Sequence, residues 1–226
     1  ACLLPVSYLK KQGDVRFKTS KERETQMKTL EEILSDKINQ IAEDVDEATI
    51  TMNCEHVLLC YNAKQVGNAV PPSKIDAVIT SPPYLNGTNY FRNTKLELWF
   101  LKELTNKNSL RLFRDDALTS AICDVKKEYS NKKINLQSPL FDKTFKRLQE
   151  TAYDRRIPLM AKCYFAEMHE LFSGLTKHLS NNAKLYVDLG DSIFGGVHIP
   201  TDLILNEVLK ALGYQFDRVS SSLYQI

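Results

Sequence analysis

The strongest constraint on the fold of this chain is a short apolar run that ends at two prolines. Residues Ile75–Thr80, "IDAVIT", are almost continuously apolar, a pattern typical of a β-strand covered on both faces, as in a parallel sheet. The run ends at Ser81–Tyr84, "SPPY", in which each proline fixes its own φ and lacks a backbone N–H donor. These residues either simply end the strand, or they hold a polar acceptor and an aromatic ring at the edge of a sheet.

Helical and strand patterns alternate along the rest of the chain, which predicts an α/β fold built on a sheet. Apolar residues at spacings of three and four predict the helices, and the first helix and Trp99 are expected to pack in a core. Helices are expected over residues 21–45, 93–104, 164–179 and 200–212, with Gly213 ending the last. Strands are expected over residues 49–54, 75–80, 184–189 and 214–226, with a turn at Asn181–Asn182.

The length of 226 residues and the 43% hydrophobic composition suit one domain, with an inserted segment at 105–160. That segment is polar and Lys-rich, and we expect it to be irregular. The formal net charge is only +2, but residues 101–165 hold 14 Lys and Arg against 8 Asp and Glu. This local excess is compatible with a surface that faces phosphates, and equally with a solvated helical face.

The cysteines and the apolar runs indicate the compartment. The five cysteines are odd in number and no two have CxxC spacing, so neither a zinc site nor a disulfide framework is expected. A reducing cytoplasm is therefore the expected location. No apolar run is long enough to span a membrane and no signal peptide is visible, so no membrane partner is expected.

The residues at the end of the apolar run suit one chemical role, the binding of an amine on a planar base. In an open α/β sheet, ligands gather beyond the carboxyl ends of the strands, where Ser81–Tyr84 would stand. The Ser81 hydroxyl and the Pro82 carbonyl are acceptors, and Tyr84 offers a flat ring. Two acceptors that draw the amine hydrogens out of plane would expose the nitrogen lone pair as it attacks. The ring would offset part of the cost of unstacking the base.

At these residues the chain resembles a known family. The stretch "DAVITSPPY", residues 76–84, resembles the catalytic motif of the amino-group DNA methyltransferases of bacterial restriction–modification systems, in which Asp, Asn or Ser precedes Pro-Pro-Tyr or Pro-Pro-Phe. The flank "LNGTNYFRNTKLELWFL", residues 85–101, is similar to an extension in these enzymes. The stretch "KLYVDLGDSIFGGVHIPTDLILNEVLKALGY", residues 184–214, is similar to their next strand, glycine turn and helix.

The resemblance implies a Rossmann-like fold in a bacterium or archaeon and methyl transfer from S-adenosylmethionine to an exocyclic amine of DNA. Ser81 and the carbonyl of Pro82 would bind the amine, Tyr84 would stack on the flipped base, and Pro83 belongs to the same motif. Serine at the first position is the form common among cytosine-N4 enzymes, and adenine N6 is the alternative target. The sulfonium of the donor needs no metal. Methylation of RNA or of protein amides is a further alternative.

The donor-binding loop of this family, Phe-x-Gly-x-Gly, is not found in the sequence. The nearest glycines, in "VDLGDSIFGG" at Val187–Gly196, fit the strand after the catalytic one better. We therefore expect residues 1–226 to be an incomplete methyltransferase domain, completed by a segment or chain that carries the donor-binding half. A non-catalytic DNA-binding or specificity subunit is the alternative from another functional class. The residues expected near the donor are Asn53, Cys54, Thr80 and Ser81, with burial in a strand as an equal alternative for Cys54.

Polar residues outside the motif are candidates for contacts with DNA. Asp188 and Asp191 flank Gly190 at a strand end, where one of them is expected to orient a substrate; Asp191 could instead cap a turn. Four polar residues that follow the motif are also candidates: Asn86, Asn89, Tyr90 and Arg92. They would line the base pocket or contact phosphate, or else stabilise a turn centred on Gly87. Arg155 and Arg156 lie in the inserted segment, where they are expected either to bind the DNA backbone or to form a solvated pair.

Overall fold

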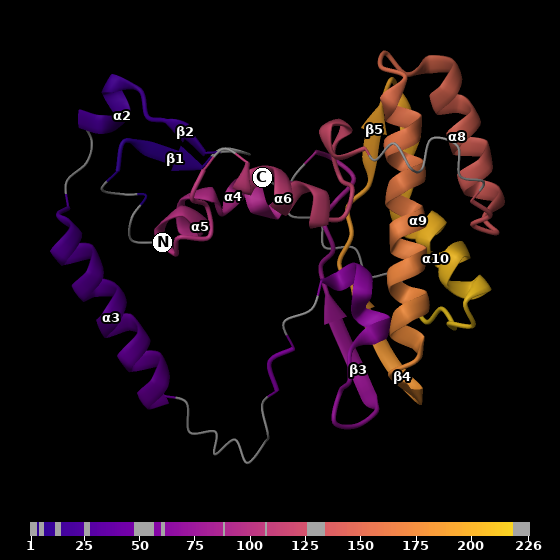
Figure 1. Ribbon diagram of the computed structural model, residues 1–226, viewed down its shortest axis with the longest axis horizontal. Coiled ribbons are helices and arrows are strands. Elements are labelled where there is room, and N and C mark those ends of the chain that lie inside the picture. The colour runs from indigo at the N-terminus through magenta and orange to yellow at the C-terminus, as the bar shows by residue number, and fades with distance from the viewer. Residues whose placement is uncertain are drawn as a thin grey trace. The chain divides into compact units, whose positions relative to one another are not determined.

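The chain divides into two compact units in the computed structural model (Figure 1). The first unit comprises Ala1–Leu58 and Tyr90–Leu110, and the second comprises Leu59–Asn89 and Arg111–Ile226. The structure describes residues 4, 7–11, 15–24, 28–47, 57–59, 62–87, 89–106, 108–125 and 134–218. The strand expected at 49–54 lies outside the described residues.

The first unit holds short elements and one long helix. Its strands β1 (Leu9–Lys11) and β2 (Val15–Phe17) pair in antiparallel fashion. The helices are α2 (Ser20–Glu24), α3 (Leu30–Glu47), α4 (Tyr90–Asn93), α5 (Lys95–Phe100) and α6 (Ser109–Asp116). The helix expected at 21–45 is divided into α2 and α3, and α4 and α5 stand in place of the helix expected at 93–104. Helix α6 begins at the end of the unit.

Two expectations about the core are wrong in this unit. The apolar stripe of α3, which includes Leu34, Ile38 and Ile41, is exposed rather than packed on a core. Trp99 on α5 is 64% exposed. An apolar stripe predicts that a helix forms, because the pattern is local, but it does not supply the element that would cover the stripe.

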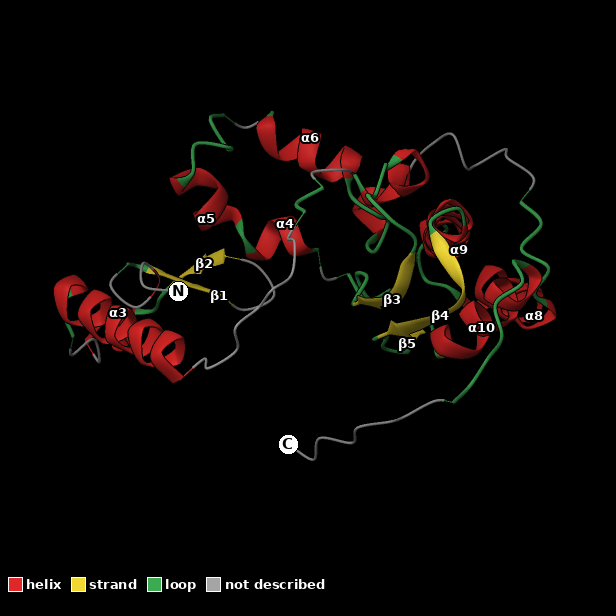
Figure 2. Cartoon of the chain, turned by 90° about the horizontal axis from the view of Figure 1, so that it is seen from below, coloured by secondary structure: helices red, strands yellow, loops and turns green. Residues whose placement is uncertain are grey.

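The second unit contains the expected parallel strand pair. Strand β3 (Ile75–Thr80) pairs in parallel with β4 (Leu179–Val187). The long helix α9 (Arg156–Thr176) directly precedes β4 in the chain. Figures 1 and 2 show α9 beside this strand pair. The other elements are η1 (Ala63–Asn68), η2 (Ile122–Asp124), α8 (Pro139–Thr151), β5 (Ser192–Phe194), β6 (Val197–Ile199) and α10 (Thr201–Ala211). The expectation of a mixed α/β protein is confirmed.

The register of the strand pair is regular next to the prolines and irregular at the other end. Ala77 to Thr80 lie opposite Lys184 to Val187, whereas Ile75 lies opposite Leu179, so β4 carries extra residues between the two pairs. The turn expected at Asn181–Asn182 falls inside this irregular part of β4. The parallel pairing therefore fixes most firmly the end of β3 that leads into Ser81.

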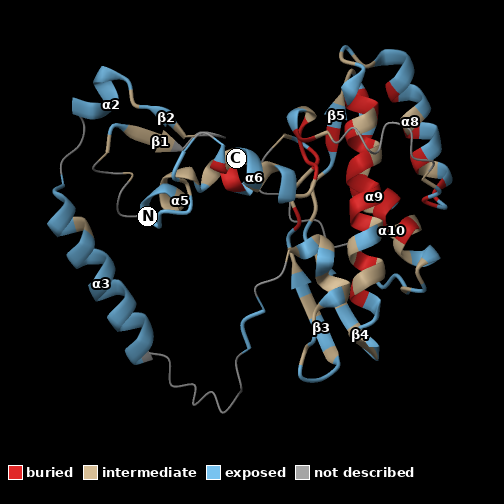
Figure 3. Ribbon diagram, in the orientation of Figure 1, coloured by how far each residue is buried: buried red, intermediate tan, exposed pale blue. Residues whose placement is uncertain are grey.

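The core of the second unit is built around α9. Buried residues surround the middle of this helix, where Cys163 to Met168 are all buried, and α9 packs against η1, η2, α8 and α10 (Figure 3). The inner face of the strand pair, with Val78, Leu185 and Val187, packs against this core. On the outer face, Ile79 is 85% exposed and its register partner Tyr186 is 57% exposed. One face of the sheet is thus covered and the other is open.

The segment expected to be irregular is largely helical. It contains the whole of α6, the whole of α8 and the start of α9, which begins at Arg156 rather than near Tyr164. Ser138 caps α8 by accepting a hydrogen bond from the Phe141 N–H at 3.0 Å. The polar composition of residues 105–160 therefore reflects helices that bury only one face. At the other end of the chain, residues 214–218 form no strand, and residues 219–226 lie outside the described part.

Helix α9 approaches η1 through two glycines, which makes this contact sensitive to a single methyl group. A Cβ on Gly174 would lie 2.9 Å from the Gly67 nitrogen. Glycine-to-alanine changes inside helices normally stabilise, by about 1 kcal/mol. Here we expect Gly174→Ala to destabilise the protein by about 1–3 kcal/mol, because two backbones would have to separate. Urea unfolding measures this, with Ser173→Ala as the control; equal stability of both variants would contradict the close contact.

Candidate functional site

The Ser-Pro-Pro-Tyr segment forms an elbow at the carboxyl end of β3. Pro82 and the following Leu85 are buried, Ser81 is exposed, and Pro83 and Tyr84 are half-buried. The buried residues anchor the elbow in the core, and the two prolines restrict its backbone. The hydroxyl of Ser81 and the ring of Tyr84 therefore remain at the surface of the second unit on a stiff support.

A carboxylate from the neighbouring strand meets both of these side chains. The Asp188 N–H donates to the Thr80 carbonyl at 3.0 Å, which continues the pairing of β3 and β4 by one residue. The Oδ2 of Asp188 accepts a hydrogen bond from the Tyr84 hydroxyl at 2.6 Å and one from the Ser81 hydroxyl at 3.3 Å. The parallel register thus brings Asp188 to two side chains that lie 107 and 104 positions earlier in the sequence.

The residues after Asp188 support the same arrangement. A Cβ on Gly190 would lie 3.1 Å from Cδ2 of Tyr84, so the ring rests against a position where only a hydrogen fits comfortably. Asp191 has different partners. Its Oδ1 accepts from the Thr201 N–H at 3.0 Å at the start of α10, and its Oδ2 lies 2.7 Å from Nε2 of His198. Of the two carboxylates expected at this strand end, Asp188 faces the elbow and Asp191 caps a helix.

The turn that follows the elbow is held from two sides. The Gly87 N–H donates to the Ser120 carbonyl at 2.9 Å, and Gly87 has a φ of +85°, which favours glycine. The Ser192 hydroxyl donates to the Leu85 carbonyl. These bonds tie the turn to two segments of the second unit, so the elbow has a fixed backbone on its C-terminal side.

A buried polar network lies behind this turn. Asn89 is 2% exposed and Asp124 is 4% exposed, and the Asn89 amide donates to Asp124 Oδ1 at 3.4 Å. The Ser120 hydroxyl donates to Asn89 Oδ1, and Asp124 Oδ2 accepts from the Ala121 N–H at 3.0 Å. Asn89 was expected either to contact DNA or to stabilise the turn, and this buried, hydrogen-bonded environment fits the second role.

The other candidates for DNA contacts are distributed over both units. Asn86 is exposed on the turn of the second unit, whereas Tyr90 and Arg92 lie on α4 of the first unit. Arg155 and Arg156 are exposed near the start of α9. The guanidinium of Arg156 lies 2.7 Å from Asp154 Oδ2, and its hydrogen bonds lower the pKa of Asp154 to about 2. Arg156 is therefore one partner of a surface ion pair.

Only part of the group of residues expected near the methyl donor can be located in the structure. Asn53 and Cys54 lie outside the described residues, so Thr80 and Ser81 are the members of the expected donor group that can be located. Gly195 and Gly196 form the turn between β5 and β6, with φ values of +57° and +74°. Val187–Gly196 therefore comprises the end of β4, the strand parallel to β3, and part of the β5–β6 hairpin.

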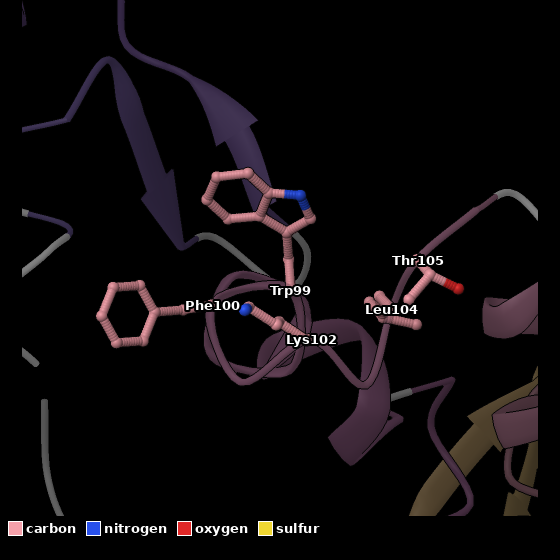
Figure 4. Close-up of a pocket in the computed structure, with 5 residues that line it drawn as sticks. All are labelled: Trp99, Phe100, Lys102, Leu104 and Thr105. Carbon is pink, nitrogen blue, oxygen red and sulfur yellow. The ribbon is translucent and has the colours of Figure 1, made fainter.

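The first unit contains a separate hollow of about 390 Å³. It is lined by exposed aromatic residues of α5 and by the chain that follows it, and Figure 4 shows the side chains of Trp99 and Phe100 pointing in different directions. Lys102, Leu104 and Thr105 complete the lining. Among the described residues that line the hollow, Lys102 carries the one charged side chain.

Comparisons with known proteins agree with the motif. No family model and no solved structure matches the chain. It is similar to two curated proteins, each named Type II methyltransferase M.AvaI, from Nostoc sp. (strain PCC 7120 / SAG 25.82 / UTEX 2576) and from Anabaena variabilis. Each is 29% identical over 157 residues, which make up 64% of this chain and 32% of the relative.

This similarity confirms the resemblance to the methyltransferases of restriction–modification systems that the elbow residues indicated. The chain spans about a third of the length of these curated relatives. In the part of the chain that the structure describes, no helix is both long and apolar enough to cross a membrane.

Proposed function

We propose that this chain is the amine-binding part of an S-adenosylmethionine-dependent DNA methyltransferase. The exocyclic N4 of cytosine is the leading target, and N6 of adenine is the alternative. The observation that carries the proposal is the elbow itself: Ser81 is exposed and Tyr84 half-exposed at the carboxyl end of a parallel strand, which is where ligands of α/β sheets gather. The similarity to two Type II methyltransferases supports the same class of reaction.

The proposed role of the elbow follows from the chemistry of an exocyclic amine. Its lone pair is delocalised into the base, so the nitrogen attacks poorly unless acceptors draw its hydrogens out of the ring plane. The Ser81 hydroxyl and the Pro82 carbonyl would supply these acceptors from a backbone that cannot relax. The ring of Tyr84 would stack on the flipped base, which offsets its unstacking by about 1–3 kcal/mol.

The arrangement of the second unit is compatible with one side of a Rossmann-like sheet. Parallel strands need a long crossover connection, and the described elements between β3 and β4 are α4, α5, α6, η2, α8 and α9. Among the described residues, β3 pairs on one edge only. Since a parallel sheet is usually covered on both faces, the exposed Ile79 and Tyr186 support a sheet that another segment or chain completes.

That completing part would also bring the methyl donor, because the donor-binding glycine loop is not found in this sequence. S-adenosylmethionine would supply an electrophilic methyl group, and the residues of this chain would hold the amine and the base. DNA is therefore the proposed partner of the elbow, with Asn86 and Arg155 as the exposed candidates for contacts to it in the second unit.

A tritium-transfer assay tests the proposed function. The chain is incubated with methyl-labelled S-adenosylmethionine and either unmethylated plasmid DNA or total RNA, alone and with a candidate completing chain. We expect label in DNA, recovered after hydrolysis as N4-methylcytosine. Recovery as N6-methyladenine would change the target base, and label in RNA alone would refute DNA as the substrate.

The missing donor site favours one other candidate, a non-catalytic subunit that binds DNA and keeps the methyltransferase shape. Isothermal titration with S-adenosylmethionine separates the two proposals. Heat of binding, for the chain alone or with its completing part, is expected for the enzyme. Binding in neither sample, together with retained binding of DNA, would support the non-catalytic subunit.

A further inference from the structure

One carboxylate oxygen receives the hydroxyl protons of both motif residues. Oδ2 of Asp188 accepts from the Tyr84 hydroxyl at 2.6 Å and from the Ser81 hydroxyl at 3.3 Å. An ionised carboxylate is an acceptor only, so the direction of both hydrogen bonds is fixed. Asp188 itself is held by its N–H bond to the Thr80 carbonyl, at the point where β3 ends.

The direction of the Ser81 bond matters because a hydroxyl can either donate or accept. A serine that donates toward the substrate would oppose the role proposed for it, since the amine also presents hydrogens. When the Ser81 proton points to Asp188, Oγ presents lone pairs rather than a proton toward the amine. A carboxylate or amide at the first motif position would need no such help, because its oxygen is already an acceptor.

We propose that Asp188 is the positioning residue of this site: it makes Ser81 an acceptor toward the amine and fixes the ring of Tyr84. This inference rests on the proposed function. The ring is held at two points, by the hydrogen bond from its hydroxyl to Asp188 and by its contact with Gly190. Asp188 does not touch the base, so its effect on methyl transfer passes through Ser81 and Tyr84.

The test replaces the carboxylate by an amide of nearly equal size. Asn at position 188 can still accept from Tyr84, but it also presents N–H groups that the Ser81 oxygen can accept, which reverses the hydroxyl. We expect Asp188→Asn to lower kcat for tritium transfer to DNA by about 100-fold. The KM for DNA should change by less than about threefold, because the DNA-contacting surface is unchanged. The exposed Asp217, replaced by Asn, is the matched control and should retain wild-type kinetics.

A second measurement separates failure of this inference from failure of the proposed function. Urea unfolding of Tyr84→Phe, Asp188→Ala and the double variant forms a cycle that needs no catalysis, and alanine removes the acceptor that asparagine would keep. A coupling of about 3- to 10-fold in the unfolding constant is expected if Asp188 holds Tyr84. Additive effects, or kcat in Asp188→Asn within about threefold of wild type, would overturn the inference. A wild-type chain that transfers no label even together with its completing part would refute the proposed function, and the cycle would still decide whether Asp188 holds the ring.

Discussion

Ser81→Ala is expected to lower kcat for methyl transfer to DNA by about 100-fold or more, the cost typical of removing one preorganised group that stabilises a transition state. The variant removes the acceptor proposed for the amine and the donor to Asp188 Oδ2. The fold should be unaffected, because Ser81 is exposed and the neighbouring Pro82 and Leu85 carry the burial of the elbow. Tritium transfer at saturating DNA measures the change in kcat, and circular dichroism checks the fold.

The matched control is Ser73→Ala, an exposed serine in the loop before β3. It should leave both activity and stability at the wild-type level. If Ser81→Ala transferred label as fast as this control, the amine would have to be bound elsewhere, and the role proposed for the elbow would be wrong.

Phe165→Ala is expected to produce the largest loss of stability, about 3–5 kcal/mol in the free energy of unfolding. Phe165 on α9 is fully buried, and its ring centroid lies 5.4 Å from that of Phe141 and 5.2 Å from that of Tyr164. Truncation removes these edge contacts and leaves a cavity where α8 meets α9. Urea denaturation of the whole chain measures the effect.

Phe100→Ala is the control for this second prediction, because Phe100 is 61% exposed. An exposed phenylalanine contributes little buried area, so the change should stay within about 0.5 kcal/mol. Equal losses in the two variants would mean that α9 is not the centre of the core.

Local patterns were sufficient to predict the elements that form the site. The apolar run Ile75–Thr80 is a strand as expected, and the expected strand at 184–189 lies in β4 and its continuation. The last helix begins at Thr201 beside Pro200 and ends before Gly213, whose φ is +92°. Proline and glycine act on their own backbone, so their effects can be inferred from sequence alone.

Elements that depend on distant partners were predicted less well. The helix α8 was expected to be irregular because its exposed face is rich in charge, and its buried residues Phe141, Thr144 and Leu148 are few. The opposite error occurred at α3, where a clear apolar stripe remains exposed. In both cases the composition of a segment is known from the sequence, but the neighbour that covers it is not.

The site shows the same division between local and distant information. The motif Ser81–Tyr84 was recognised from its residues, and Asp188 and Asp191 were equivalent candidates because both flank Gly190. Only the register of β3 and β4 assigns Asp188 to the elbow and leaves Asp191 to α10. A pattern of residue types does not contain a strand register, so this assignment could not be made from sequence.

The bond between Ser81 and Asp188 joins residues 107 positions apart, which has a consequence for how the protein is made. During synthesis, Ser81 leaves the ribosome long before Asp188, so the arrangement of Ser81, Tyr84 and Asp188 cannot exist on the nascent chain until α9 and β4 have emerged. Pairings of such high contact order also close slowly, because loop entropy is lost before the contacts form. Activity should therefore appear late in refolding, after most of the helical signal has recovered.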